Sequence, residues 1–466
     1  MKLQPNPPWK KTLTLLLAGG CLLMGSAAAV ADIGTVIWQQ KFNPTSSSWN
    51  NGFFHSVGFN TDGSILANGW RGEADSDSAI GVRYDAETGA VLDTPAEWFL
   101  FEHTWSDYTA DRFMDQHTDS SGNTYFVGMG YGANWNSFSS RYNVPNIWKY
   151  SSSYDNPVSD IPDRPLWRKY HVGTGSAADE NGRFENMAVD NSGNIYAVGF
   201  YTQTAANRDW FIDRYDSDGN RAAGFPLSHD KDGLHDYAYD VATDSEGNFV
   251  VVGSVLADAA TDHHNWAVRK YKSDGTLLWE TEYDLAGSHD QAFYVAIDGD
   301  NNIIVSGYRR NAAPEDDNDW YIVKYAGDGD GIGSATIMWE QSWDDGNSKH
   351  GVGYEIAIDS GNNFYIIGIQ LKDSVTPAFS DRYRGILQYR DGQTGDVLQS
   401  QAIELDTTVN NKPELEHDFV RRLMLYGDQL VIAGYTQQDG GYTVTRGRTG
   451  RVVMLHLPPL FKDGFE

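Results

Sequence analysis

The sequence predicts an all-β fold, a single seven-bladed β-propeller built from four-stranded antiparallel blades. The chain has 466 residues with 48 glycines, 15 tryptophans and 26 tyrosines, and this composition favours short strands and tight turns over helices. One arrangement of apolar strands and turns recurs seven times along the chain, which is typical of a propeller. The seventh copy lacks its fourth strand and a surplus strand precedes the first copy, so we expect the two to pair.

Residues 1–31 have the pattern of a secretory signal peptide. Three lysines precede a mostly apolar run, Leu13–Met24, and the small residues Ala29-Val30-Ala31 form a cleavage site before Asp32. The run is too short for a permanent membrane anchor, and no later segment is long and apolar enough to span a bilayer. We therefore expect a periplasmic or secreted protein.

The single cysteine, Cys21, lies within this leader. Because Ala18-Gly19-Gly20-Cys21 loosely resembles a lipobox, a lipoprotein anchored at Cys21 is the alternative. Cleavage before Asp32 removes the cysteine, and the exported chain then has no disulfide and no thiol chemistry.

The repeat is clearest when Tyr237–Trp279 is aligned with Gln291–Trp339. Each copy has an alternating first strand, a D-x-x-G-N type turn and a more continuous apolar second strand that ends at glycine. Such turns between period-two apolar runs predict β-hairpins. The glycines that mark the register are Gly69, Gly128, Gly199, Gly253, Gly307, Gly368 and Gly434.

The third strand of each copy ends in a basic residue followed by tyrosine, and a D-G turn leads to a fourth strand that often starts at tryptophan. The third-strand pairs are Arg83-Tyr84, Lys149-Tyr150, Arg214-Tyr215, Lys270-Tyr271 and Lys324-Tyr325, with Gln388-Tyr389 as a variant. The seventh copy departs from this pattern and ends after its third strand, Val452–Leu457.

The surplus strand is Thr35–Phe42, which resembles the fourth strands beginning at Trp167, Trp279 and Trp339. We expect it to complete the last blade and close the ring, because closure hides both edge strands. The predicted domains are therefore the leader 1–31, the propeller 32–457 and a C-terminal tail 458–466.

The pattern A-x-D-x-x-G-N-x-x-V-x-G, then D-W-x-x-x-K-Y, then D-G-x-x-x-W resembles the SBBP-type bacterial β-propeller repeat. The match is best in copies three to six. This resemblance implies a secreted or surface propeller and implies no particular activity.

The formal net charge of −29 argues against a nucleic-acid partner and against adhesion to anionic membranes. The usual catalytic and nucleotide-binding motifs are absent from the sequence. The acidic turns at Asp216 and Asp328 fail the spacing of an EF-hand calcium loop, which requires an acid at position twelve. We predict no cofactor, and weak Ca²⁺ binding to the acidic surface stays open.

A His-Asp pair recurs before the first strand of several blades. In a four-stranded blade this position shares a face with the loop after the second strand, so the two sets could converge at one mouth of the channel and bind a ligand. The alternative is that each pair caps a strand entry. The ligand-face candidates are His235, Asp236, His289, Asp290, His350, His417 and Asp418 at the strand entries, and Asp262, His263, His264, Asp316 and Asp317 in the loops.

These observations predict a binding or interaction protein, a monomer, with an unknown protein or glycan ligand and no catalytic residue that we would name. The alternative is an extracytoplasmic enzyme. The turns Tyr84–Gly89 and Asp391–Gly395 resemble those of quinoprotein dehydrogenases, which usually have eight blades. A glycan-active propeller would stack sugars on Trp210, Trp266 or Trp320, although packing between blades explains these indoles equally well.

Overall fold

A computed structural model describes most of the propeller region but not the leader. The described residues are 33–42, 51–72, 77–92, 98–99, 112–131, 143–151, 165–171, 181–204, 207–258, 263–284, 289–311, 318–327, 335–344, 350–372, 382–403, 416–438 and 448–457. Residues 32–466 form one compact unit. Across the described ranges the regular elements are all strands, and no helix could cross a membrane.

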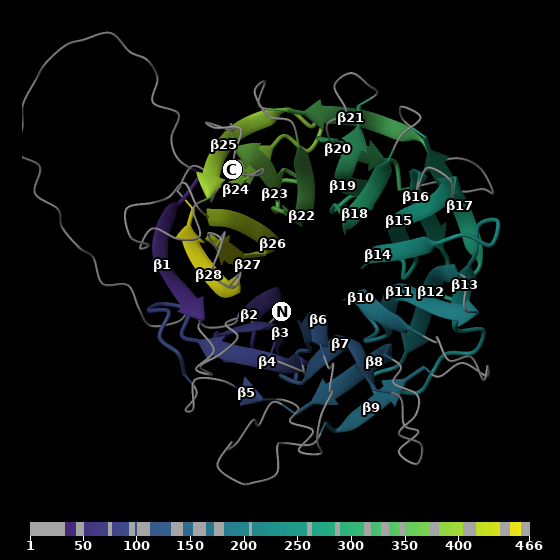
Figure 1. The fold of residues 1–466 in the computed structure, drawn as a ribbon, viewed down its shortest axis with the longest axis horizontal. Helices are drawn as coiled ribbons and strands as arrows, with labels where there is room; N and C mark the ends of the chain where they lie inside the picture. Colours follow the sequence, from purple (N-terminus) through teal and green to yellow (C-terminus); the bar gives the residue numbers. More distant parts are fainter. Residues whose placement is uncertain are drawn as a thin grey trace, which may run out of the picture. The chain divides into compact units, whose positions relative to one another are not determined.

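The strands form seven antiparallel blades around a ring, which confirms the predicted fold class (Figure 1). Blade one comprises β2 (Asn51–Phe59), β3 (Ile65–Gly72), β4 (Asp77–Tyr84) and β5 (Trp98–Phe99); blade two β6 (Arg112–Thr118), β7 (Thr124–Tyr131), β8 (Asn143–Tyr150) and β9 (Trp167–Tyr170); blade three β10 (Gly182–Val189), β11 (Ile195–Thr204), β12 (Asn207–Tyr215) and β13 (Leu227–His229). Blade four comprises β14 (Asp236–Thr243), β15 (Phe249–Asp258), β16 (His263–Tyr271) and β17 (Leu277–Tyr283); blade five β18 (Asp290–Ile297), β19 (Ile303–Arg310), β20 (Asn318–Tyr325) and β21 (Ile337–Trp343). Blade six comprises β22 (Gly351–Ile358), β23 (Phe364–Lys372), β24 (Arg382–Arg390) and β25 (Val397–Ile403); blade seven β26 (Glu416–Tyr426), β27 (Gln429–Gln438), β28 (Arg448–His456) and β1 (Thr35–Phe42).

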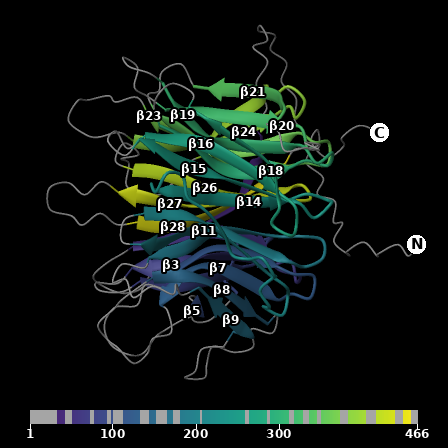
Figure 2. The same cartoon turned by 90° about the vertical axis from the view of Figure 1, so that its right-hand side faces the viewer.

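The first strand of each blade is innermost, and the first strands of successive blades contact one another around the ring. Figure 2 shows the strands running from one face of the ring to the other. Successive residues of a first strand therefore lie at successive depths along the central channel.

The N-terminal strand closes the ring as predicted. Strand β1 pairs antiparallel with β28, from Thr35 opposite His456 to Phe42 opposite Gly450. The last blade thus combines three strands from the end of the chain with one from its beginning.

The D-x-x-G-N turns are hairpins held by their first aspartate. In blade five the Asp298 carboxylate accepts hydrogen bonds from the backbone N–H groups of Asp300 and Asn302, at 2.9 and 2.8 Å. Asn301 takes the left-handed conformation, with φ 64°, which asparagine tolerates better than most residues. Part of the acidity of the chain is therefore required by turn geometry.

The seven register glycines allow a close backbone approach. A Cβ built on Gly253 would lie 2.0 Å from the backbone oxygen of Tyr237 and 2.9 Å from the Trp210 ring. The other six glycines face a first-strand backbone oxygen at 1.9 to 2.3 Å in the same way. Opposite each glycine the first strand contains a β-bulge, a feature that re-aims a side chain.

The three indoles proposed as sugar platforms are fully buried, so that use of Trp210, Trp266 and Trp320 is wrong. The Trp210 indole N–H donates to the Ser254 backbone oxygen of the next blade at 3.0 Å, and Trp320 repeats the contact with Ile369 at 2.9 Å. The alternative expectation of packing between blades is confirmed.

The D-x-x-T-G turns also have structural partners. Asp391 accepts hydrogen bonds from the backbone N–H and the hydroxyl of Thr394, and Gly395 lies directly against the Trp339 ring of the preceding blade. Gly89 lies against Trp38 in the same way. These contacts explain the turns by blade packing.

The basic residue of the third strand also joins blades. Lys324 pairs with the Asp298 carboxylate at 2.7 Å within its own blade and donates to the Gly392 backbone oxygen of the next blade at 2.7 Å. Burial raises the pKa of Asp298, but hydrogen bonds from Lys324 and Asn302 outweigh it and hold that pKa below its ordinary value. Lys270 makes the equivalent contacts with Asp244 and Gly327.

We predict that Lys324→Met lowers the free energy of unfolding by about 2–3 kcal/mol. Removing one partner of a buried pair costs about 3–5 kcal/mol, and Asp298 keeps its bonds to backbone N–H groups, which places the cost at the lower end. Denaturant unfolding measures it. The control is Lys272→Met at an exposed position, for which we expect a change within about 0.5 kcal/mol; equal effects of the two variants would contradict the role of the pair.

Candidate functional site

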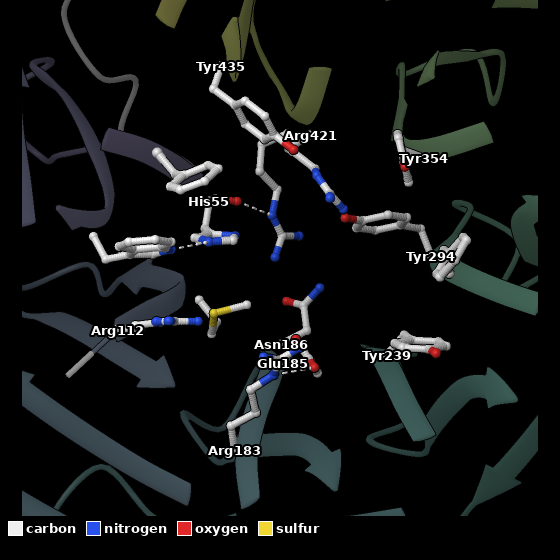
Figure 3. Close-up of a pocket in the computed structure, with 15 residues that line it drawn as sticks. His55, Arg112, Arg183, Glu185, Asn186, Tyr239, Tyr294, Tyr354, Arg421 and Tyr435 are labelled. Atoms are coloured by element: carbon white, nitrogen blue, oxygen red, sulfur yellow. Dashed lines mark hydrogen bonds and ion pairs between the residues drawn. The ribbon is translucent and has the colours of Figure 1, made fainter. Parts of the chain in front are cut away.

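The seven bulges place one side chain from each blade against the central channel, as the view in Figure 3 shows for several of them. A bulge lets the extra residue project where the regular pleat would not. The bulge residues are His55, Met114, Glu185, Tyr239, Phe293, Tyr354 and Arg421, and all seven line one cavity. The scaffold is seven-fold, whereas this set of side chains is not.

The cavity has a volume of about 390 Å³. Besides the bulge residues it is lined by Phe53, Trp70, Arg112, Arg183, Asn186, Tyr294, Arg422 and Tyr435. Four of the lining residues are arginines and one, Glu185, is acidic. In a chain with a net charge of −29, this concentrates positive charge at the channel, where low-dielectric walls strengthen its field.

Arg422 lies at the end of the cavity farthest from the strand starts, and it ties blades together. Its guanidinium contacts Asp115 Oδ1 of blade two at 3.5 Å and Glu355 Oε1 of blade six at 3.4 Å. Its Nε donates to the backbone oxygen of His55 in blade one at 2.8 Å. This arginine has acidic partners and a structural role.

Arg421, the neighbouring residue, has a different environment. Its guanidinium carbon lies 5.1 Å from the centre of the Tyr354 ring, and its side chain hydrogen-bonds Tyr435. Its Nε is buried without a hydrogen-bond partner. No carboxylate of the described residues forms an ion pair with it, and a partly buried cation without a counter-charge favours an anionic ligand.

Two further arginines lie nearer the strand starts, each two residues before a bulge. Arg183 Nε donates to Glu185 Oε1 at 2.6 Å, and about a third of the Arg183 side chain is exposed. Arg112 stacks over the Trp70 ring at 4.4 Å. Both guanidiniums are positioned by a neighbour and still line the cavity.

His55 is a neutral side chain in this cationic site. Burial, followed by the positive charges of the four cavity arginines, holds its pKa well below the ordinary value. Its Nε2 accepts a hydrogen bond from the Trp70 indole at 3.0 Å, so the remaining proton resides on Nδ1. His55 is therefore a neutral imidazole, and its one acceptor nitrogen, Nε2, already accepts the Trp70 hydrogen bond.

The His-Asp pairs lie outside this cavity and bond to backbone. His235 Nδ1 accepts the N–H of Arg208 at 3.1 Å, which links blade four to blade three, and His350 accepts the N–H of Asn318 at 3.3 Å. The buried Asp236 carboxylate accepts the N–H groups of Lys231 and Leu256, and burial raises its pKa to about 7. Asp290 accepts the N–H of Arg310 at 3.1 Å.

The structure brings some of the loop candidates together. The His263 and His264 rings lie 6.3 and 5.9 Å from the His289 ring, respectively. Asp262, Asp316 and Asp317 lie outside the described residues, as do the side chains of His417 and Asp418. A ligand role for these twelve residues stays a prediction, and among the described residues no three histidine, cysteine or acidic side chains converge as a metal site.

The bulge residues belong to no repeated motif because their side chains vary from copy to copy, and only tyrosine occurs twice, at Tyr239 and Tyr354. Their position was nevertheless in the sequence: in six copies the bulge residue precedes the register glycine by fourteen positions, as Tyr239 precedes Gly253, and in the seventh copy by thirteen. This near-constant spacing to the register glycine is the signal in the sequence that marks the bulge positions.

Comparison with known proteins supports the architecture. No family model and no curated protein matches the chain. A solved polysaccharide lyase described as an ulvan lyase is 10% identical, with a TM-score of 0.51 over 90% of this chain and 96% of that one. The polysaccharide lyase Uly1 is 11% identical, with a TM-score of 0.48 over 90% and 93%. A protein of unknown function from Dyadobacter fermentans is 10% identical, with a TM-score of 0.44 over 90% and 99%. At these identities the likeness shows the propeller fold alone.

Proposed function

We propose that this propeller binds an acidic glycan, with the carboxylate or sulfate group of one sugar held in the central cavity by Arg421. The observation that carries the proposal is the Arg421 guanidinium, which lines the cavity without an acidic partner among the described residues and whose Nε is buried without a hydrogen bond. A charged oxygen of the ligand would supply the counter-charge that this guanidinium lacks among the described residues.

The remaining lining suits a sugar better than a bare ion. Aromatic rings, among them Tyr239 and Tyr354, line the cavity with apolar carbon and polar hydroxyls, and Asn186 supplies an amide that can both donate and accept. A volume of about 390 Å³ is also far larger than an inorganic anion needs. We also propose that this binding occurs outside the cytoplasm, which the leader pattern of residues 1–31 and the resemblance to SBBP-type repeats support.

The test measures binding by calorimetry. The ligands are oligosaccharides of uronic acids, a sulfated oligosaccharide and a neutral oligosaccharide of equal length. We expect binding of an acidic chain that weakens as salt is added, because screening reduces charge–charge attraction. Equal affinity for the neutral chain, or no affinity for either acidic chain, would overturn the proposal.

We predict that Arg421→Gln weakens binding of the acidic chain by about tenfold to a hundredfold. A hydrogen bond to a charged group contributes about 1.5–3 kcal/mol, and each 1.4 kcal/mol is a factor of about ten. The unfolding midpoint serves as the control measurement: we expect no decrease, because Arg421 has no ion pair to lose. Unchanged affinity in a folded variant would show that the anion is held elsewhere.

His55 supports a second candidate, cleavage of the glycan by β-elimination. A neutral imidazole beside arginines can take the C5 proton next to a uronate carboxylate while a guanidinium neutralises that carboxylate. The electrons of the C5–H bond then form the C4=C5 double bond, the C4–O glycosidic bond breaks, and the departing oxygen takes a proton from the imidazolium or from water. The Trp70 indole must first release Nε2, and for this reason binding is the primary proposal. Ultraviolet absorbance of an unsaturated uronate product separates elimination from binding alone.

A further inference from the structure

A second cavity lies beside the first and is also lined by arginines and aromatic rings. It has a volume of about 300 Å³ and shares Arg112 and Arg183 with the central cavity. Its other lining residues are Met129, Asn143, Asn181, Phe200, Arg208 and Tyr237, from blades two, three and four. Three arginines and no acidic residue line it.

The arginines of this second cavity are held in place by aromatic rings. The guanidinium carbons of Arg183 and Arg208 lie 5.4 and 5.3 Å from the centre of the Phe200 ring. Arg208 Nη1 also donates to the Tyr237 hydroxyl at 2.7 Å. Cation–π contacts and this hydrogen bond hold two positive groups about one ring. Arg183 also pairs with Glu185, whereas Arg208 forms no ion pair with a carboxylate of the described residues.

Position along the chain explains why the two cavities meet. Arg112, Arg183 and Tyr237 each lie two residues before a bulge, in three successive first strands. They therefore form the row above the bulge residues on the side where first strands begin. Arg208 lies on β12, the third strand of blade three, and extends this set of arginines away from the channel.

We propose that the second cavity is a subsite for a further acidic sugar of the same glycan chain. The chain would pass from Arg421 in the central cavity, between Arg112 and Arg183, to Arg208 over blades three and four. This inference rests on the proposed function and extends it: the ligand is a linear polyanionic glycan with acidic groups on more than one sugar. Two adjoining cavities with one continuous set of arginines fit a chain better than a monosaccharide.

The test compares oligouronides of two lengths, a disaccharide and an octasaccharide, on the wild type and Arg208→Gln. The wild type should bind the octasaccharide at least about tenfold more tightly, since each charged hydrogen bond contributes enough for a factor of ten. Arg208→Gln should lose about tenfold for the octasaccharide and less than about twofold for the disaccharide. Arg214→Gln is the matched control: it lies on the same strand, stacks over Tyr196 at 5.5 Å and lines neither cavity, so both affinities should stay.

The outcomes separate the two proposals. Binding that does not depend on length and is unchanged in Arg208→Gln would overturn the subsite and leave the central cavity supported. Absence of all binding by the wild type would overturn both. A sulfated chain that follows the same length and variant pattern supports the subsite with sulfate as the acidic group, whereas an acidic peptide of equal charge that binds as tightly would overturn the assignment to a glycan.

Discussion

Replacing Gly253 by alanine should lower the free energy of unfolding by more than about 3 kcal/mol. The new Cβ would lie 2.0 Å from the Tyr237 backbone oxygen and 2.9 Å from the Trp210 ring. Overpacking usually costs about 1–3 kcal/mol when side chains can adjust, but here the obstacle is the backbone of the paired strand. The pairing of β14 with β15 must open locally, and the bulge that aims Tyr239 into the cavity would shift with it.

Denaturant unfolding of Gly253→Ala measures this cost, and Gly361→Ala is the matched control. Gly361 lies in a hairpin turn, where the closest atom to an added Cβ is a carboxylate oxygen of Asp359 at 3.3 Å, so a side chain can move aside. Since its φ is not in the left-handed region, alanine should leave stability unchanged or raise it slightly. Equal loss in both variants would mean that the register contact is not what makes glycine necessary.

The same glycine explains how much of the fold could be predicted from sequence. Gly253 and its six counterparts recur because each permits the same backbone approach, and any other residue is excluded. Asp298 and Lys324 recur because a turn and a pair between strands need them. The backbone imposes the same requirements in every blade, so the pattern of one copy predicted the strand order and turns of the others. The missing fourth strand of the seventh copy predicted the closure.

The candidate site was harder to predict for the opposite reason. His55, Glu185 and Arg421 occupy equivalent positions but differ in charge and chemistry. An alignment of the copies therefore shows no consensus residue at this position. A functional site on a symmetric scaffold must break the symmetry. The His-Asp pairs were singled out because they repeat, and the described members of that set, such as His235 and Asp236, bond to backbone at strand entries.

Net charge is an average that does not describe the channel. The value of −29 argues against a nucleic-acid partner and against adhesion to anionic membranes, and it says nothing of how the charges are distributed. The structure separates the charges, because aspartates such as Asp298 gather in the turns while Arg112, Arg183 and Arg421 line the channel. The proposal of an anionic ligand therefore rests on where the arginines lie in the structure and not on the net charge of the sequence.

Arg421 and Arg422 are adjacent in sequence and should respond differently to the same substitution. We expect Arg422→Met to lower the free energy of unfolding by about 5 kcal/mol at pH 8, the upper end for a broken buried pair. The substitution leaves the Asp115 and Glu355 carboxylates without their shared cation and the His55 oxygen without its donor. Arg421→Met should cost less than about 1 kcal/mol, because it removes a charge that no described carboxylate pairs with.

The pH dependence makes this prediction specific. Burial raises the pKa of Glu355 to about 7 even though Arg422 opposes the shift, and loss of Arg422 must raise it further. A carboxyl whose pKa is higher in the folded protein than in the unfolded chain binds more protons when folded, so its contribution is fully present at low pH and is lost as pH rises through the folded value. The cost of Arg422→Met should therefore be smaller at pH 5 and grow towards pH 8, while that of Arg421→Met, which removes no partner of a described carboxylate, should show no comparable rise. A cost that is independent of pH in both variants would mean that the two carboxylates do not depend on Arg422, and the division into one structural and one ligand-binding arginine would fail.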